Sequence, residues 1–187
     1  MTKNPDKFLE SDVQKGGEFL VKDIAAADVF IPEDFNEEQL MVRDMVVDFL
    51  HNDILVNMDQ YEKREGNIAE RLLAKAGELG LLGSHMPEEY GGMAMDTNTN
   101  TLICDAMGPA GGFCTTFAAH TGIGMLPILY FGSEEQKSKY LPGMITGELK
   151  AAYCLTEPGS GSDALAAKTR ADLTEDGKHY FLTVQNI

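Results

Sequence analysis

A loop late in the sequence carries residue types suited to holding an anion. After an apolar stretch, Ala151 to Leu155, the chain reads Thr-Glu-Pro-Gly-Ser-Gly-Ser-Asp from Thr156 to Asp163. Glycines let a backbone present successive amide N–H groups to an anion, and nearby hydroxyls add donors. Such a loop suits a phosphate or the polar edge of a heterocycle. The same composition is also typical of a plain β-turn, because Pro, Gly, Ser and Asp are common turn residues.

The order of the residues favours the first interpretation. The run Tyr153–Asp163 resembles the flavin-binding signature of the acyl-CoA dehydrogenases. Further blocks resemble the same family in order and spacing: Leu79–Gly83, Pro87–Gly92, Phe131–Lys137, Tyr140–Pro142 and Gly147–Glu148. The resemblance covers roughly residues 36 to 182, and Gly16–Leu20 resembles the longer, very-long-chain-type bacterial branch.

Composition excludes several other classes of function. The 187 residues carry 15 basic and 30 acidic side chains, a net charge of −15, without the basic stripe that nucleic-acid binders show. Three cysteines without CxxC spacing and four scattered histidines predict neither a disulfide framework nor a metal site. Met1 to Gly17 lacks the apolar run of a secretory signal, so we expect a cytoplasmic protein.

One uncharged stretch needs a membrane test. Met107 to Ser133 contains no Asp, Glu, Lys or Arg, which exceeds the roughly 20 residues that span a bilayer. Prolines, glycines, threonines and His120 interrupt it, however. We therefore expect a buried, bent helix of a soluble protein and no transmembrane span.

The periodicity of apolar residues predicts an α+β chain, in which an all-α domain precedes the first strands of an incomplete β-domain. We expect an irregular leader (1–35), a helical domain (36–148) and a truncated start of a β-domain (149–187). Helices are predicted after Asn36, from Asn67 to Gly80, up to Pro109, from about Phe113 to Met125 with a break at Pro127, and from Ser133 to about Leu141. The residue types at 36–39 and 133–136 predict capping boxes at the first and last of these helix starts. Strands are predicted at 151–155, 168–173 and 179–185, with a turn at 175–177.

The resemblance implies a specific reaction. Acyl-CoA dehydrogenases oxidise a fatty acyl-CoA to the trans-2-enoyl-CoA: a glutamate removes the α-proton and FAD accepts the β-hydrogen as hydride at flavin N5. In the family FAD lies between the helical and β-domains, and electrons then pass to an electron-transferring flavoprotein. Full-length members form homo-oligomers.

The resemblance also assigns cofactor-binding residues in the loop. Backbone groups around Leu155 and the Thr156 hydroxyl are expected at the polar edge of the isoalloxazine ring. Gly161 and Ser162 are expected at the pyrophosphate, and Ser162 also at the pantetheine arm of the substrate. The complete set is Tyr153, Cys154, Leu155, Thr156, Gly161 and Ser162. Two alternatives stay open: Thr156 caps a turn, and Ser162 caps the segment that follows.

Other candidates favour structural roles. We expect the carboxylates of Glu157 and Asp163 to stabilise the turn. Because the unperturbed pKa of histidine lies near neutrality, His120 fits a general base, but a packed, hydrogen-bonded core histidine is favoured. Core packing is likewise favoured over an acyl channel for Phe113, Thr116, Phe117 and Met125. No residue is assigned as catalytic or metal-binding.

The sequence departs from the family pattern at two points. Leu182 is followed by Thr-Val-Gln-Asn-Ile in place of Asn-Gly-Gln-Lys, and the chain has no tryptophan for the family's second flavin contact. The family's catalytic glutamate lies far downstream of these residues. We therefore expect an incomplete enzyme that is inactive alone. The alternative is a non-catalytic helical interaction module derived from the family; an unrelated phosphate-binding enzyme is disfavoured because GxxxxGK[ST] and GxGxxG are absent.

Overall fold

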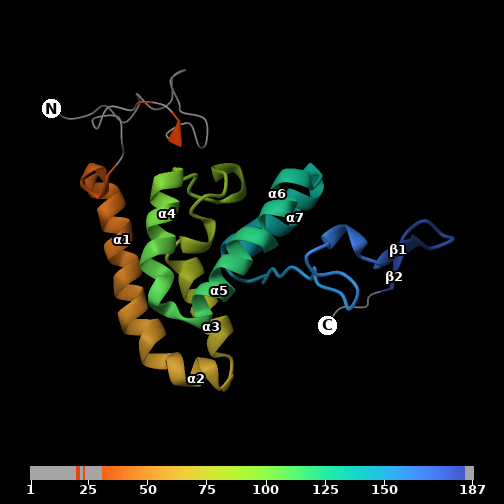
Figure 1. Cartoon of the computed structure of the whole chain (residues 1–187), viewed down its shortest axis with the longest axis horizontal. Helices are drawn as coiled ribbons and strands as arrows, with labels where there is room; N and C mark the ends of the chain where they lie inside the picture. Colours follow the sequence, from red (N-terminus) through yellow and green to blue (C-terminus); the bar gives the residue numbers. More distant parts are fainter. Residues whose placement is uncertain (1–19, 22, 24–30, 184–187) are drawn as a thin grey trace. The chain divides into compact units, whose positions relative to one another are not determined.

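A computed structural model describes residues 20, 21, 23 and 31–183 (Figure 1). Most of the predicted leader, the Gly16–Phe19 block and the last residues of the third predicted strand lie outside these residues. The chain divides into two compact units, Met1–Leu40 and Met41–Ile187, which are considered separately.

The described end of the first unit contains a short 3₁₀ turn, η4 (Pro32–Asp34), and the start of helix α1 (Glu37–Phe49). The predicted capping box is confirmed. The Gln39 N–H donates to Asn36 Oδ1 at 2.8 Å, and the Asn36 N–H donates to Gln39 Oε1 at 3.1 Å. These reciprocal bonds satisfy two amide groups at the helix start and fix where α1 begins.

In the second unit the chain remains helical well beyond α1. A wide π turn, η5 (Leu50–Ile54), a 3₁₀ turn, η6 (Leu55–Asn57), and a short helix, α2 (Met58–Glu62), follow in sequence. Helix α3 (Ile68–Glu78) then ends at Gly80, whose φ of 75° stops the helix as the sequence predicts.

Two 3₁₀ turns, η7 (Leu81–Gly83) and η8 (Glu88–Tyr90), lead to helix α4 (Thr97–Met107). The carboxylate of Asp96 caps α4 by accepting the Thr99 N–H at 3.0 Å. The helix ends before Pro109, as predicted, and η9 (Gly108–Ala110) links it to the next helix.

The next helical stretch is longer than predicted. It comprises α5 (Gly112–Ala118), a π turn, η10 (Ala119–Gly124), and α6 (Leu126–Phe131). Pro127 does not break it, because Pro127 lies in the first turn of α6, where a missing N–H costs nothing. The predicted end at about Met125 is therefore wrong, and the stretch ends at Gly132.

By length and composition, Gly112–Phe131 is apolar enough to cross a membrane. A single helix of this kind is weak evidence, because core helices of soluble proteins pass the same test. Within its most apolar stretch of 18 residues, only 28% is buried, so the expected burial holds for one face of the helix. That face carries Phe113, Phe117, His120, Thr121 and Met125.

Helix α7 (Glu134–Ile145) starts at the predicted capping box. The Gln136 N–H donates to Ser133 Oγ at 3.3 Å, and the Ser133 N–H donates to Gln136 Oε1 at 2.9 Å. The predicted end at about Leu141 is four residues too early. Pro142 cannot donate a backbone hydrogen bond and its ring crowds the preceding turn, but burial of Met144 and Ile145 favours continuing the helix past it.

Two hydrophobic clusters hold the helices together. The first combines residues of α1, η5, α3, η7, α4, η9 and α5: Val46, Phe49, Leu50, Ile54, Ile68, Leu72, Leu73, Ala76, Leu81, Leu82, Ile103, Met107, Ala110, Phe113 and Phe117. The second lies around α7, which packs against α6 (Figure 1), and contains Met86, Tyr90, Met125, Leu141, Met144 and Ile145.

The carboxyl-terminal part contains one antiparallel hairpin (Figure 1). Strand β1 (Arg170–Leu173) pairs with β2 (Tyr180–Thr183), with Arg170 opposite Thr183. The turn between them is confirmed: Gly177 has a φ of 67°, and its N–H donates to the carbonyl of Thr174. The α+β class is confirmed as well, with helices first and strands after them.

The strand predicted at 151–155 is wrong. Residues 151–156 belong to no helix or strand, and neither β1 nor β2 pairs with them. An apolar, β-prone sequence forms a strand only beside a partner whose backbone completes the hydrogen bonds, and this segment has no partner strand within residues 31–183. It is a connection between the helices and the hairpin.

Candidate functional site

The loop that the sequence singles out is a tight turn. The Glu157 N–H donates to the Ser160 carbonyl, and the Ser160 N–H donates to the Glu157 carbonyl, both at 3.0 Å. Pro158 and Gly159 form the tip of the turn, where the fixed φ of proline suits the first position. Residues 152–156 enter this turn fully on the surface.

The turn brings together some of the predicted site residues. Because Glu157 and Ser160 pair, Thr156 and Gly161 flank the paired residues on opposite arms of the turn. Ser162 follows on the same exposed arm as Gly161, whereas Tyr153 and Cys154 lie further back along the connection. All six predicted cofactor residues are exposed, and Tyr153 exposes 52% of its surface.

The donors of this loop are available to a ligand. Within residues 31–183, neither the N–H groups nor the hydroxyls of Thr156 and Ser162 hydrogen-bond to the protein, and the Gly161 N–H is equally unpaired. A Cβ added at Gly161 would meet no atom within 4 Å. Gly159 and Gly161 both lack a positive φ, so open space, and not an unusual backbone conformation, is what glycine provides here.

A buried carboxylate fixes the loop to the start of the hairpin. Glu157 is 5% exposed, and its oxygens accept the N–H groups of Lys168 at 2.6 Å and Thr169 at 3.0 Å. Hydrogen bonds from Thr169 and Lys168 hold the pKa of the Glu157 carboxyl below its usual range. These contacts give Glu157 the structural role expected from the sequence.

Ser160 and Asp163 also stabilise the turn, though not as predicted. The buried hydroxyl of Ser160 donates to the backbone carbonyl of Asp163 at 2.9 Å. The stabilising group is therefore the main chain of Asp163, and the prediction of a stabilising carboxylate is wrong. Sequence reasoning missed Ser160 because its hydroxyl looks the same as those of Thr156 and Ser162, and only burial distinguishes it.

A histidine anchors the connection at its other end. His120 is 1% exposed; its Nδ1 accepts the Ala151 N–H at 3.0 Å, and its Nε2 lies 2.9 Å from the Met144 carbonyl. Since an amide N–H only donates, Nδ1 is unprotonated and Nε2–H donates to Met144. Burial is the main cause that lowers the pKa of His120. The favoured core-histidine interpretation is confirmed.

The side chains considered for an acyl channel lie mostly in the core. Phe113 is fully buried and packs edge-to-face on Phe49 and Tyr61. Phe117 belongs to the same cluster and Met125 to the second one. The Thr116 hydroxyl shares a 2.6 Å hydrogen bond with the Tyr61 hydroxyl. Core packing, the favoured interpretation for most of the four, accounts for Phe113, Phe117 and Met125, whereas Thr116 is half-buried and lies in neither cluster.

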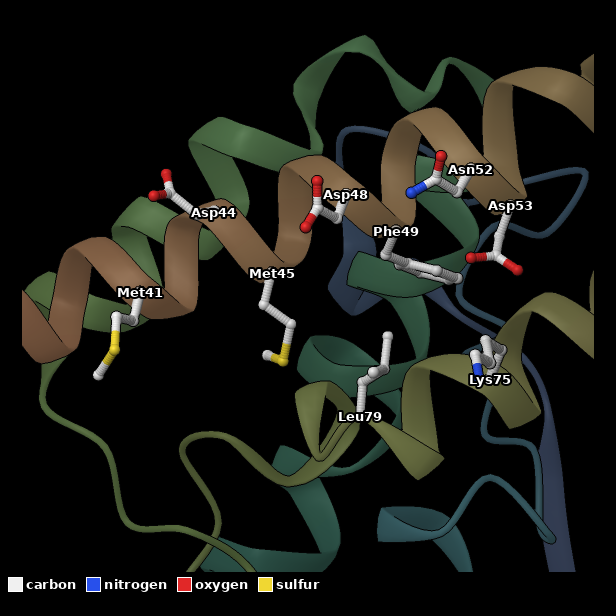
Figure 2. Close-up of a pocket in the computed structure, with 9 residues that line it drawn as sticks. All are labelled: Met41, Asp44, Met45, Asp48, Phe49, Asn52, Asp53, Lys75 and Leu79. Atoms are coloured by element: carbon white, nitrogen blue, oxygen red, sulfur yellow. The ribbon is translucent and has the colours of Figure 1, made fainter.

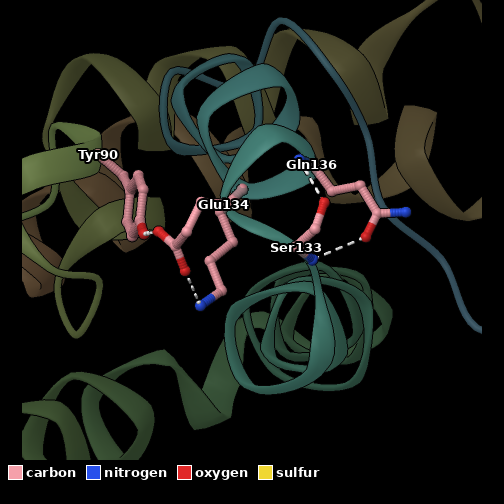
Figure 3. A network of polar contacts seen from close by, with 5 residues as sticks. Tyr90, Ser133, Glu134 and Gln136 are labelled. Carbon is pink, nitrogen blue, oxygen red and sulfur yellow. Dashed lines mark hydrogen bonds and ion pairs between the residues drawn. The ribbon is translucent and has the colours of Figure 1, made fainter.

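A polar network joins the η8 loop to α7 (Figure 3). The Tyr90 hydroxyl donates to Glu134 at 3.0 Å, and Lys137 contacts the other oxygen of the same carboxylate at 2.7 Å. Burial, together with the neighbouring Glu134 carboxylate, raises the pKa of Tyr90 to about 12. The network ties a loop to a helix start, and we assign it no chemistry.

One surface hollow is lined by residues far from the flavin-like loop in the sequence. It has a volume of about 410 Å³, and its walls come from α1, η5 and α3 (Figure 2). Its lining mixes apolar and acidic side chains with one lysine: Met41, Asp44, Met45, Asp48, Phe49, Asn52, Asp53, Lys75 and Leu79. No group of three or more potential metal ligands occurs in the part of the chain that the structure describes.

Comparison with known proteins decides the family. A family model described as "Acyl-CoA dehydrogenase, N-terminal domain" matches residues 36–148. The chain belongs to the acyl-CoA dehydrogenase family. A probable acyl-CoA dehydrogenase of Bacillus subtilis (strain 168) is 53% identical over 173 residues, which are 92% of this chain and 29% of that protein. The resemblance seen in the sequence is thus confirmed.

Solved structures of other proteins share the fold of this chain. An acyl-CoA dehydrogenase from Bacillus anthracis, complexed with FAD, superimposes with a TM-score of 0.86 at 54% identity, over 90% of this chain and 29% of that one. A chain from a structure of the electron transferring flavoprotein of Acidaminococcus fermentans superimposes with a TM-score of 0.70 at 33% identity, over 81% of this chain and 40% of that one. The present chain therefore spans less than a third of the length of its two Bacillus relatives.

Proposed function

We propose that the chain is the amino-terminal part of an FAD-dependent acyl-CoA dehydrogenase that oxidises fatty acyl-CoA to trans-2-enoyl-CoA in fatty acid β-oxidation. The observation that carries this proposal is that Thr156, Gly161 and Ser162 present exposed, unpaired donors, while Ala151 before them and Glu157 between them are anchored by hydrogen bonds. The similarity to the Bacillus anthracis protein, which is complexed with FAD, supports FAD as the ligand.

The loop fits a flavin dinucleotide on features of this chain alone. Free N–H groups at Gly161 and Ser162 suit the negative charge of a pyrophosphate, and the open space at Gly161 lets that group approach the backbone. The exposed side chains of Tyr153 and Leu155 lie beside these donors in the sequence. An apolar surface next to polar donors is what a ring with one polar edge requires.

We propose a cofactor role for Tyr153, Cys154, Leu155, Thr156, Gly161 and Ser162. The backbone around Leu155 and the Thr156 hydroxyl hold the polar edge of the ring system. The amides of Gly161 and Ser162 hold the pyrophosphate, and Ser162 also contacts the pantetheine arm of the acyl-CoA.

The contribution of these residues to the reaction is positional. When bound, FAD supplies the acceptor for the hydride. Hydrogen-bond donors fixed in advance stabilise negative charge on a bound group without reorganising during the reaction. We assign no base within the 187 residues; in the resemblance that role falls to a glutamate outside them. We therefore propose that these residues alone do not turn over acyl-CoA.

The wider organisation follows from the same proposal. We propose a leader at 1–35, the helical domain at 36–148 and the start of the β-domain at 149–187; the span of the family model supports the middle boundaries. The full protein would form a homo-oligomer and pass electrons to an electron-transferring flavoprotein. A cytoplasmic location is supported by the free thiols of Cys104, Cys114 and Cys154.

A non-catalytic interaction module is the second candidate. Large apolar side chains are fully on the surface at Phe131, which is 87% exposed, and at Leu165, which is 98% exposed. Apolar surface of this kind suits contact with other protein. It suits a covering domain of the same enzyme equally well, so binding of FAD separates the two candidates.

The proposal is tested by titrating FAD with the purified chain and with a longer chain that contains it, using flavin fluorescence. We expect saturable binding that is weakened at least tenfold by Thr156→Ala combined with Ser162→Ala. Ser138→Ala, an exposed hydroxyl on α7, is the matched control and should leave the affinity unchanged. If neither chain binds FAD, the flavin role is refuted and the interaction module is favoured.

A further inference from the structure

The connection from the helices to the flavin-like loop has few supports of its own. Residues 151–156 pair with no strand among residues 31–183, and residues 152–156 are exposed. A segment of this kind samples many backbone conformations unless contacts at its ends restrict it. The contacts at the Glu157 end have been described. The contact at the other end is His120, which bonds the N–H of Ala151.

His120 bridges three parts of the chain that are distant in sequence. It lies in the π turn η10, accepts from Ala151, 31 residues later, and donates to the carbonyl of Met144 near the end of α7. All hydrogen-bonding groups of the neutral ring are thereby used. The bridge fixes Ala151 relative to both η10 and α7.

Ala151 is also confined by steric contact with η10. A Cβ built on Gly124 would lie 2.5 Å from the Ala151 Cβ and 3.1 Å from its carbonyl carbon. The absence of a side chain at Gly124 is therefore what lets Ala151 lie against the π turn. The hydrogen bond from Ala151 to His120 and the steric contact with Gly124 therefore act on the same residue, two positions before Tyr153.

We propose that His120 is a positioning residue for the cofactor segment: its neutral Nε2–H form holds Ala151, and through it the backbone that leads to Tyr153, Leu155 and Thr156. This inference rests on the proposed flavin role of that segment. His120 does not touch the cofactor or the reacting atoms in this account. It sets the point from which the segment leaves the helical domain.

The chemistry of the ring makes the bridge dependent on protonation. A proton added at Nδ1 would place two N–H groups against each other and remove the only acceptor for Ala151. Two other titratable groups act on this region. The Lys150 ammonium lowers the pKa of His120 further, and His85, which bonds the Thr121 carbonyl, is itself held below its usual pKa by burial. The anchoring is therefore fully present above the usual histidine pKa of about 6.5 and is lost as the pH falls through the lowered pKa of His120.

The test compares His120→Leu and His120→Gln by amide hydrogen exchange and by FAD affinity between about pH 5 and pH 8. In the wild type we expect exchange in residues 151–156, corrected for its intrinsic pH dependence, to rise as the pH falls. At about pH 8, His120→Leu should raise it roughly fivefold, as expected for one lost buried hydrogen bond, and weaken FAD binding by a similar factor, and both differences should shrink as the pH falls. Exchange in α3 should stay constant.

His120→Gln is the conservative variant, and it distinguishes the protonation-dependent anchor from a merely structural role. Its amide keeps one acceptor and one donor but does not titrate. We expect near-wild-type exchange and affinity at about pH 8 and loss of the pH dependence. Unchanged exchange in residues 151–156 of the leucine variant, or an equal pH dependence in the glutamine variant, would overturn the inference. If the leucine variant does not fold, the pH profiles of the other two proteins decide. If neither the wild-type chain nor a longer chain that contains it binds FAD, the proposed function fails, while the exchange data still decide on the anchoring.

Discussion

Gly124→Ala gives a sharp prediction about the contact between η10 and the cofactor segment. The added Cβ would lie 2.5 Å from the Ala151 Cβ and 2.9 Å from the backbone carbonyl oxygen of Ala119. The second contact is with main chain and cannot be relieved by rotating a side chain. Relief of the first contact requires Ala151 to move, because an alanine Cβ has no side-chain rotation, and that movement stretches the hydrogen bond of Ala151 to His120.

The magnitude follows from a comparison with Gly122→Ala in the same π turn. A Cβ at Gly122 meets no atom within 4 Å, and Gly122 lacks a positive φ. Both substitutions share the gain of roughly 0.5–1 kcal/mol that alanine has over glycine in a helix. That gain cancels in the difference between the two variants. The remainder is the overpacking cost at Gly124, about 1–3 kcal/mol.

Thermal unfolding of the two variants measures this difference. For a chain of this size, 1 kcal/mol shifts Tm by about 2–4 °C, so Gly124→Ala should melt roughly 2–12 °C below Gly122→Ala. Hydrogen exchange should place the loosening at residues 151–156. Equal melting temperatures together with unchanged exchange in that segment would refute the reasoning, because the backbone contact would then not confine Ala151.

Three further predictions concern other described contacts. Glu157→Gln keeps one acceptor for two N–H groups, so we expect faster hydrogen exchange at Lys168 and Thr169. Because hydrogen bonds lower the pKa of Glu157, the wild-type anchoring is present above the usual pKa range of a carboxyl group and is lost as the pH falls through the lowered pKa. Wild-type anchoring that does not depend on pH would contradict this. Tyr90→Phe should remove a tyrosinate absorbance step at about pH 12, and a wild type without a step at that pH would contradict the Tyr90–Glu134 contact. Phe113→Ala should lower the free energy of unfolding by about 3–5 kcal/mol in denaturant titrations, and a cost below about 1 kcal/mol would show that Phe113 is not the core residue described.

The helices were the most predictable part of the fold, because their signals are local. The capping boxes at Asn36 and Ser133 and the stop at Gly80 are decided by residues within one turn of each other. The ends near Met125 and Leu141 were placed too early. At both places a proline suggests a break. Pro127 instead lies in the first turn of α6, and burial of the side chains after Pro142 favours continuing α7.

The segment at 151–155 shows where sequence reasoning failed. Its apolar residues predict a strand, but a strand depends on a partner that local sequence does not reveal. The contacts of His120 with Ala151 and Met144 are equally non-local, so the sequence could favour a core histidine without naming what it holds. Likewise, only the structure distinguishes the buried Ser160 from the exposed Thr156 and Ser162.

The cofactor role of the loop is the central claim, and the most direct measurement is a hydrogen-exchange footprint of FAD on the purified chain or on a longer chain that contains it. We expect protection at residues 153–156 and 161–162, where the free donors lie, and little change in the hollow between α1 and α3. Protection confined to that hollow, or no protection anywhere at saturating FAD, would contradict the proposed site.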